Sequence, residues 1–375
     1  MKITEVVMRR LHLPLREPFE TSFGRETDKD VILLELRTAD GAIGFGECTA
    51  SSAPLYNEET NGTAWHILQT FLLPALRERE IHDVSSLTKV NRAFRVFKGN
   101  RMAKAALEMA VWDAYAQSVG TPLHQLLGGA KTEIPVGISV GIQADIPTLV
   151  RKVEGYLAQG FQRIKVKVKP GLDVEPLRAL RDAFGDIPLM ADANSAYRLS
   201  DLNRLRAMDE LGLMMIEQPL ANDDIIDHAT LQAQLNTPVC LDESIHSAED
   251  ARKAIEIGAC RIINLKLGRV GGFAEALEIH QVCVNAGIPL WCGGMLETGI
   301  GRLHNVAITA LPGFTLPGDT APSARYFEED LIDPAVEFVS PGVLAVEPLA
   351  GVETRVRRDR ISKWTVAEET ISLSR

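Results

Sequence analysis

The sequence predicts an α/β protein in which a parallel β/α barrel follows a smaller α+β unit. From Gly129 onward, short β-branched runs alternate with amphipathic helical stretches, each pair taking roughly 25 residues, as in consecutive β-α units around a parallel sheet. No glycine-rich dinucleotide-binding fingerprint follows the first run, which favours a closed barrel over an open doubly wound sheet. The 375 residues are enough for a barrel and a companion domain.

The N-terminal third reads as strands followed by helices. Alternating apolar residues predict three strands of an antiparallel meander, at residues 2–11, 30–37 and 43–47. Residues 18–24 are expected to form a loop with two aromatic side chains between the first two strands. Residues 57–127 repeat apolar side chains at helical spacing, and two glycines end this part. We therefore expect an α+β domain at residues 1–128.

Eight later runs qualify as barrel strands by their β-branched and apolar content. They occupy residues 134–140, 163–168, 188–191, 213–216, 238–241, 261–265, 289–292 and 314–316. These runs place the barrel at residues 129–320. The alternation is lost in the C-terminal segment, residues 321–375, whose strand-like pieces at 343–346 and 361–366 are expected to return to the N-terminal domain.

Composition and charge exclude several classes of protein. The formal net charge is −10 and the pI is about 5.4, and no stripe of Lys and Arg interleaved with aromatic residues is present, so we expect no nucleic-acid partner. No apolar run approaches the roughly 18 residues of a membrane span and no secretory leader is recognisable, so we expect a cytoplasmic protein without a membrane partner. The five cysteines form no CxxC pair and suit reduced, buried thiols.

Three carboxylates stand at predicted strand ends, at equal intervals along the chain: Asp192, Glu217 and Asp242. Such side chains point into the common mouth of a barrel. Unit charges about 4 Å apart at an effective dielectric near 20 repel by about 4 kcal/mol, so a cation must offset three carboxylates in one cleft. Oxygen donors suit Mg²⁺, with Mn²⁺ or Co²⁺ as substitutes, whereas Zn²⁺ would favour His or Cys. Taken singly, each carboxylate would more commonly be a helix cap or an ion-pair partner.

Lysines end the second and sixth predicted strands. Lys165 and Lys167 share one face of a strand whose other face is apolar, so both are expected to point into the barrel. Strands two and six of an eight-stranded barrel lie opposite each other, so Lys167 and Lys266 would face one another across a bound molecule. A nearby dication, a second ammonium and partial burial are expected to lower the pKa of these lysines toward neutrality, as a general base requires. A Schiff-base lysine is the alternative chemistry, although it needs no flanking carboxylates.

Together these residues resemble the enolase superfamily and, within its muconate-lactonising subgroup, the o-succinylbenzoate synthase/N-acylamino acid racemase family. The resemblance spans essentially the whole chain, and its most specific part is residues 291–302, WCGGMLETGIGR. Other matching segments are residues 18–24, 99–103, 169–171 and 192–195. The resemblance implies a (β/α)7β TIM-like barrel with an α+β capping domain formed by the N-terminal third and the C-terminal tail.

The resemblance also implies roles for individual residues. Lys167 and Lys266 would be the acid/base pair, Lys165 would polarise the substrate carboxylate, and the three carboxylates would bind Mg²⁺. The substrate would be lined by Ser139, Asn194 and Met295 and, from the capping domain, by Phe19, Phe23 and the loop at residues 50–56. Because these capping segments carry little charge, an apolar or acylated substrate tail is expected.

The implied reaction removes the proton α to a carboxylate through an enediolate. Its outcome would be racemisation of an N-acylamino acid, such as an N-succinylamino acid, or formation of o-succinylbenzoate for menaquinone synthesis. The binding partner would be a small-molecule carboxylate, and we expect a homo-oligomer.

Three more residues are candidates for supporting roles. Arg269 would depress the pKa of Lys266 by like-charge repulsion or would be an ordinary surface arginine. Glu243 would be a partner for a lysine just beyond the metal ligands. Glu297 would orient the substrate through a polar network or cap the helix that follows.

Other interpretations stay open. A muconate cycloisomerase or a dipeptide epimerase would use the same barrel, although residues 316–320 lack the Asp-x-Asp pair expected of an epimerase at this point. A non-catalytic metal- or ligand-binding barrel is a different class of protein, and it would not need two opposed lysines.

Overall fold

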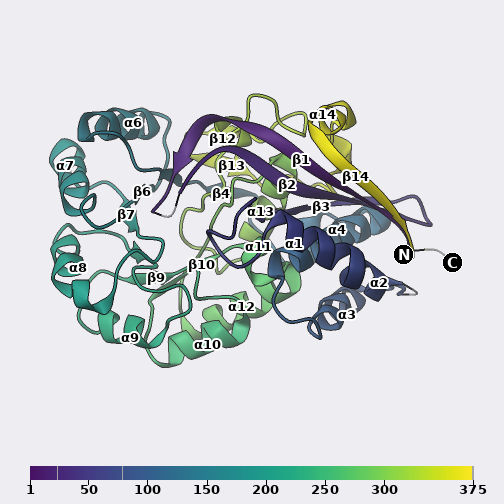
Figure 1. Ribbon diagram of the computed structural model, residues 1–375, viewed down its shortest axis with the longest axis horizontal. Helices are drawn as coiled ribbons and strands as arrows, with labels where there is room; N and C mark the ends of the chain where they lie inside the picture. The colour runs from purple at the N-terminus through teal and green to yellow at the C-terminus, as the bar shows by residue number, and fades with distance from the viewer. Residues whose placement is uncertain (23, 78, 374–375) are drawn as a thin grey trace.

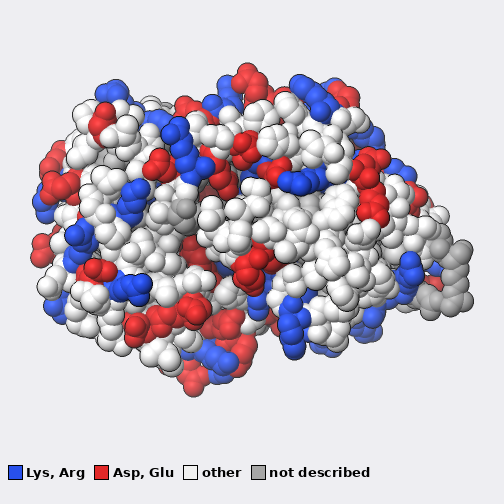
Figure 2. Space-filling model, in the orientation of Figure 1, with Lys and Arg blue, Asp and Glu red and all other residues white. Residues whose placement is uncertain are grey.

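The computed structural model describes residues 1–22, 24–77 and 79–373. Figure 1 shows a barrel beside a domain built on two long N-terminal strands, in purple, against which the yellow C-terminal strand lies. Within the described ranges, no helix is long and apolar enough to cross a membrane. Acidic and basic side chains are interspersed over the face shown in Figure 2, without one continuous basic area.

The capping domain is built on an antiparallel sheet in the order β14-β1-β2-β3. Its strands are β1 (Ile3–Glu20), β2 (Arg25–Thr38), β3 (Ile43–Cys48) and β14 (Thr365–Ser372). The expected meander is confirmed, but β1 runs on to Glu20, so the loop expected at residues 18–24 is wrong at its start. After a register shift that begins at Pro14, pairing resumes between Phe19 and Glu26. Pro14 and Pro18 have no N–H for the ladder, which interrupts the pattern that predicts a strand.

Helices follow the meander, as expected. They are α1 (Asn61–Ile67), the π-helical η1 (Leu68–Leu72), α2 (Leu73–Leu76), α3 (Val84–Phe94), α4 (Arg101–Val119) and α5 (Leu123–Leu126). The longest, α4, packs so closely on β3 that a Cβ at Gly46 would lie 1.9 Å from the carbonyl oxygen of Ala106. Glycine at this position is therefore what lets the helix lie on the sheet.

The barrel is a parallel sheet in the order β5 to β11. Its strands are β5 (Ile138–Val140), β6 (Ile164–Lys167), β7 (Leu189–Asp192), β8 (Ile216–Glu217), β9 (Val239–Leu241), β10 (Ile262–Leu265) and β11 (Leu290–Cys292). The eighth run, residues 314–316, forms no strand. It is flanked by Gly313 and Pro317, which disfavour a regular ladder. Isolated parallel bridges from Phe314 to Leu290 and from Gly318 to Val136 nevertheless connect the last strand to the first and close the ring.

Amphipathic helices cover the outside of this ring, and Figure 1 shows α6 to α10 and α12 in an arc around the strands. The barrel helices are α6 (Ile146–Ala158), α7 (Val174–Phe184), α8 (Leu202–Asp209), α9 (Ile226–Gln232), α10 (Ala248–Glu256), α11 (Leu267–Val270), α12 (Phe273–Ala286) and α13 (Gly299–Thr309). Inward-facing side chains from neighbouring strands fill the space inside as a buried cluster of Met190, Met215, Cys240, Ile262 and Trp291.

Two predictions that involve the C-terminal segment differ from the structure. The first predicted barrel run is split, because β4 (Glu133–Pro135) leaves the ring and pairs antiparallel with β13 (Val343–Ala345), which continues from β12 (Phe338–Ser340). The expected return of residues 343–346 to the N-terminal domain is therefore wrong. The later piece, residues 361–366, spans the end of α14 (Arg358–Trp364) and the start of β14, which pairs with β1 and so completes the capping sheet as expected.

Two buried carboxylates of the capping domain cap helices of the barrel. Glu108 on α4 accepts the N–H groups of Phe273 (2.7 Å) and Ala274 (2.9 Å), at the start of α12. Glu47 on β3 accepts the N–H of Thr298 (3.0 Å) and of Gly301 (3.1 Å), at the start of α13. Burial raises the pKa of each carboxyl to about 7, and the nearby carboxylates of Glu275 and Glu297 respectively add to the effect.

We expect the free energy of unfolding to depend on pH through Glu47 and Glu108. Their folded pKa of about 7 exceeds the ordinary 4.5, so the folded state binds protons that the unfolded state has released between these pH values. The stabilisation is complete below about pH 4.5 and is lost as the pH rises through 7. Glu47→Gln and Glu108→Gln should each flatten the fall in stability between pH 5 and 7, by up to about 1.4 kcal/mol per pH unit.

Denaturant unfolding at pH 5, 6 and 7 measures this slope. Glu328→Gln, which changes an exposed carboxylate, is the matched control and should keep the wild-type slope. An unchanged slope in both buried-site variants would contradict the assignment.

Candidate active site

A cavity lies at the carboxyl ends of the barrel strands, between the barrel and the capping domain. Lys165, Lys167, Lys266, Ser139, Asn194 and Met295 line it from the barrel, and Phe19 lines it from β1. The cavity thus brings together most of the residues expected to contact the substrate, and the expected loop at residues 50–56 contributes Ser51, Leu55 and Tyr56. Phe23 lies outside the described residues.

Charged side chains of β2 also line this cavity, namely Arg25, Glu26 and Lys29. The expectation of a weakly charged capping wall is therefore wrong. All three precede the run that predicted the second strand, so the sequence pattern assigned them to no element. They belong to a strand only because they pair with residues of β1 in the hairpin.

The three candidate metal ligands occupy neighbouring strand ends. Asp192 is the last residue of β7, Glu217 is the last of β8, and Asp242 follows β9. In the ladder register Asp192 pairs with Lys167 on one side and with Glu217 on the other. Each of the three carboxylates is at most 1% exposed, so their charges need compensation.

Cationic side chains provide that compensation. Lys167 donates to Asp192 at 2.6 Å, Lys165 donates to Glu217 at 3.1 Å, and Lys266 donates to Asp242 at 2.7 Å. The ammonium of Lys167 and, at 3.1 Å, that of Lys165 hold the pKa of Asp192 below its usual range against the effect of burial. Burial and the charge of Asp192 raise the pKa of Glu217.

The donor set fits a hard dication in type, because three buried carboxylates end adjacent strands and neither imidazole nor thiolate is among them. In the part of the chain that the structure describes, however, no three acidic, His or Cys side chains form a metal-binding group. Each carboxylate instead accepts a hydrogen bond from a lysine. A bound dication would compete with those ammonium groups for the same oxygens.

Lys167 and Lys266 stand on opposite sides of the ring, since β6 and β10 are separated by three strands on one side and by β11, the bridging segment and β5 on the other. Burial lowers the pKa of Lys167, as expected, although Asp192 opposes the effect. For Lys266 the protein's own groups act in the direction opposite to the lowering expected beside a dication. Burial lowers its pKa as well, but Tyr56 and Glu243 outweigh burial and the net shift is upward.

Lys165 is held as a charged group. Its ammonium lies 2.8 Å from Asp319 and 3.1 Å from both Asp192 and Glu217. Burial alone would lower the pKa of Lys165, but these carboxylates raise it. Asp319 was missed as a site residue, because it lies three residues beyond the eighth run, whereas each metal candidate follows its run directly. Its other oxygen accepts from Arg163 at 2.6 Å.

Asn194 connects the two sides of the site. It adopts a φ of 41°, in the left-handed region that Asn tolerates, and its N–H donates to Asp192 at 3.1 Å. In this conformation its Oδ1 accepts from Lys167 at 2.7 Å and its Nδ2 donates to Glu243 at 2.9 Å. Glu243 thus contacts a lysine's partner, while it affects Lys266 only through its charge.

Comparison with known proteins places this geometry in a family. Residues 148–359 match the family model "Enolase C-terminal domain-like", and residues 3–128 match "Mandelate racemase / muconate lactonizing enzyme, N-terminal domain". The chain belongs to the enolase superfamily. Its fold and its being an enzyme of that superfamily are thereby confirmed.

Individual relatives of this superfamily member are close. It is 53% identical over 365 residues to an o-succinylbenzoate synthase of Geobacillus stearothermophilus, covering 97% of this chain and 96% of that protein. It is 46% identical over 374 residues to an N-succinylamino acid racemase of Thermus thermophilus, covering 100% of both. A solved structure of an enolase-superfamily member from Listeria innocua has a TM-score of 0.95 at 42% identity and covers 100% of both chains.

In this superfamily enzyme, Arg269 and Glu297 have definite partners. Arg269 is 1% exposed, so the surface alternative is wrong, and its guanidinium bonds Asp242 and the carbonyl of Asn264. Glu297 accepts from Arg302 (3.1 Å) and Asn305 (2.9 Å), both on α13. It therefore braces the body of that helix, while Glu47 accepts from Thr298 and Gly301 at its start.

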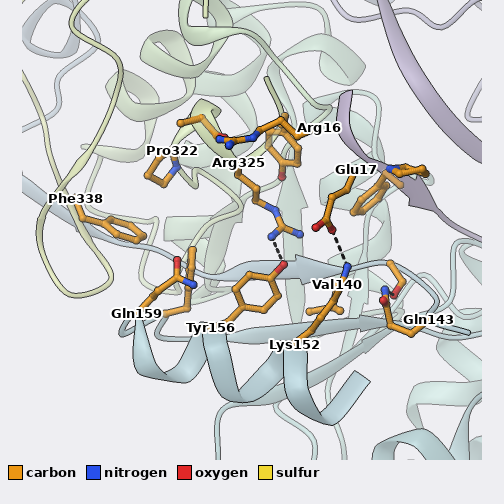
Figure 3. Close-up of a pocket in the computed structure, with 16 residues that line it drawn as sticks. Arg16, Glu17, Val140, Gln143, Lys152, Tyr156, Gln159, Pro322, Arg325 and Phe338 are labelled. Carbon is orange, nitrogen blue, oxygen red and sulfur yellow. Dashed lines mark hydrogen bonds and ion pairs between the residues drawn. The ribbon is translucent and has the colours of Figure 1, made fainter. Parts of the chain in front are cut away.

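The enzyme has a second cavity of about 530 Å³, which does not include the three site lysines. It lies between β1, α6 and the C-terminal segment (Figure 3). Glu17 bonds Lys152 across it at 2.7 Å, and Arg325 bonds Tyr156, so its charged groups are already paired. Phe19 and Tyr326 line both cavities and form the partition between them. Neither the candidate lysines nor the candidate metal ligands are among the residues that line this hollow, so we assign the chemistry to the cavity that holds Lys167 and Lys266.

Proposed function

We propose that this enzyme removes the proton α to a carboxylate, racemising N-succinylamino acids and forming o-succinylbenzoate from its hydroxylated cyclohexadiene precursor. The observation that carries the proposal is the cavity in which Lys167 and Lys266 stand on opposite sides, with Lys165 between carboxylates beside them. The names of its relatives supply the two substrate classes.

The α-proton of a carboxylate is far too weakly acidic for a lysine unless the resulting enediolate is stabilised. Lys165, whose pKa is raised by three carboxylates, keeps the ammonium that can bond a substrate carboxylate oxygen. Ser139 lines the same cavity, and its buried hydroxyl oxygen has no hydrogen-bond partner within the described part of the chain. It can donate to the same substrate.

Asp192, Glu217 and Asp242 would hold Mg²⁺, with Mn²⁺ or Co²⁺ as substitutes, and the ion would offset the negative charge developing on the substrate carboxylate. Lys167, with its lowered pKa, suits abstraction of the proton on one face. Lys266, with its raised pKa, suits donation of a proton on the other face. Return of a proton on the opposite face racemises the substrate, whereas loss of a β-hydroxyl from the same enediolate gives the aromatic product.

A dipeptide epimerase is the weaker alternative. Such an enzyme needs a free carboxylate for the ammonium of a dipeptide, and Asp319, the acid after the eighth run, is already paired with Arg163 and Lys165. Assays of the purified chain with N-succinylmethionine, the o-succinylbenzoate precursor, an Ala-Glu dipeptide and muconate distinguish the possibilities. Turnover of the dipeptide or muconate alone would overturn the proposal.

Turnover is expected to require a divalent cation. Exhaustive chelation should lower the rate about 100-fold or more, and Mg²⁺, Mn²⁺ or Co²⁺ should restore it, because the enediolate needs a Lewis acid as well as Lys165. Circular dichroism before and after chelation serves as the control for unfolding. Undiminished turnover in the chelated protein would contradict the assignment of the three carboxylates.

A further inference from the structure

The capping wall of the active-site cavity carries an ammonium with little compensation. Lys29 on β2 is 4% exposed. Among the described residues, its ammonium contacts only the carbonyl oxygen of Thr49, at 3.4 Å, and a carboxylate oxygen of Glu26, at 4.0 Å. Lys165, buried to a similar degree, has three carboxylates within 3.1 Å. An ammonium has three N–H donors, and a buried charge is costly when they are unsatisfied.

The two ends of the cavity differ in how far their positive charges are paired with carboxylates. At the barrel end, Lys165, Lys167 and Lys266 are matched by the carboxylates of the strand ends and by Asp319. At the capping end, Arg25 and Lys29 face the cavity with Glu26 as the acidic residue among the lining side chains described. Glu26 is also bonded by Ser51, at 3.1 Å. The capping end therefore keeps an excess positive charge.

Thr49, which holds the ammonium of Lys29, connects it to residues of the active site. Thr49, whose carbonyl accepts from Lys29, donates its hydroxyl to the sulfur of Met295 at 3.4 Å. A Cβ on Gly268 would lie 2.8 Å from that hydroxyl and 3.4 Å from that sulfur. Through Thr49, Lys29 is thus linked to Met295 and to the backbone at Gly268, two residues after Lys266.

We propose that Lys29 binds a second carboxylate of the substrate, at the far end from the reacting carbon, so that the enzyme prefers dicarboxylates. This inference rests on the proposed function and narrows it: among N-acylamino acids, those whose acyl chain ends in a carboxylate are preferred over those with a neutral chain. The precursor of o-succinylbenzoate carries such a carboxylate as well. One cationic residue then serves both substrate classes.

A matched pair of substrates tests the charge alone. N-succinylmethionine and N-succinamoylmethionine have nearly the same shape, but the second ends in a neutral amide. In the wild type the ratio of kcat/KM for the charged over the neutral substrate should be about 10 to 100, as expected for a hydrogen bond between charged groups. In Lys29→Met, which keeps the length of the side chain, this ratio should fall to near 1.

Two further variants separate substrate binding from structural support. Arg25→Met removes the exposed cation of the same wall and should change the ratio less than about fivefold, because an exposed charge is screened. Glu26→Gln removes the competing carboxylate and should raise the ratio. Lys29→Arg, which keeps the charge, guards against misfolding of Lys29→Met, and it should retain a ratio well above 1.

Equal losses for both substrates in Lys29→Met, or a wild type with a ratio near 1, would overturn the inference. Calorimetric titration of both ligands into the Mg²⁺-supplemented enzyme keeps this result apart from a failure of the proposed function. If neither compound is turned over, a preference for the charged ligand that disappears in Lys29→Met still supports the second carboxylate site. The absence of such a preference overturns it.

Discussion

Lys167→Ala and Lys266→Ala are each expected to abolish racemisation of N-succinylmethionine, with a loss of at least about 100-fold. The two lysines stand on opposite sides of the ring of strands, so each can reach only one face of a carbon held between them. A racemase needs one base for each face. Polarimetry or chiral chromatography of the product measures the loss.

Exchange in deuterated water gives the sharper result. A variant that keeps one lysine should still exchange the α-proton of one enantiomer, because the remaining base can remove and return a proton on its own face. The enantiomer that exchanges should differ between the two variants. Lys152→Ala, which alters the second cavity, is the matched control and should exchange both enantiomers. Exchange of both enantiomers at the wild-type rate in either lysine variant would refute the opposed-base assignment.

Much of this site was predictable because barrel topology converts sequence position into spatial position. A residue at a strand end points into one mouth, so Asp192, Glu217 and Asp242 could be placed together without any structure. The same rule could have identified Asp319, since it follows the eighth run. It was passed over because it stands three residues beyond that run, after Pro317 and Gly318, and not directly at its end.

Contacts between the domains were not predictable in this way. Lys29 enters the cavity through the β1–β2 hairpin, and Glu47 and Glu108 cap helices more than a hundred residues away in sequence. No local periodicity encodes which helix end a buried carboxylate will meet. The upward effect of the protein's own groups on the pKa of Lys266 was not foreseen for the same reason, because Tyr56 and Glu243 reach it from other elements.

Asp242→Asn and Glu217→Gln are expected to abolish turnover equally but to differ in stability. Considered from the sequence alone, removing one of three clustered carboxylates relieves repulsion. For Asp242 the contacts predict the opposite effect on stability, because it forms ion pairs with both Lys266 and Arg269. No other carboxylate of the described chain forms an ion pair with either of these two residues. Leaving two buried cations without a counter-charge should cost about 3–5 kcal/mol.

Glu217→Gln is the matched comparison, because it removes a buried carboxylate from the adjacent strand. Lys165 keeps Asp192 and Asp319 as ion-pair partners, and a glutamine oxygen can still accept from Asn264, which donates to Glu217 at 2.7 Å. The expected loss is about 1 kcal/mol or less. Denaturant unfolding in excess chelator measures both variants without a metal contribution to the folded state. Equal stabilities would show that the ion pairs of Asp242 do not hold this part of the barrel together, and that repulsion among the carboxylates dominates the metal-free enzyme.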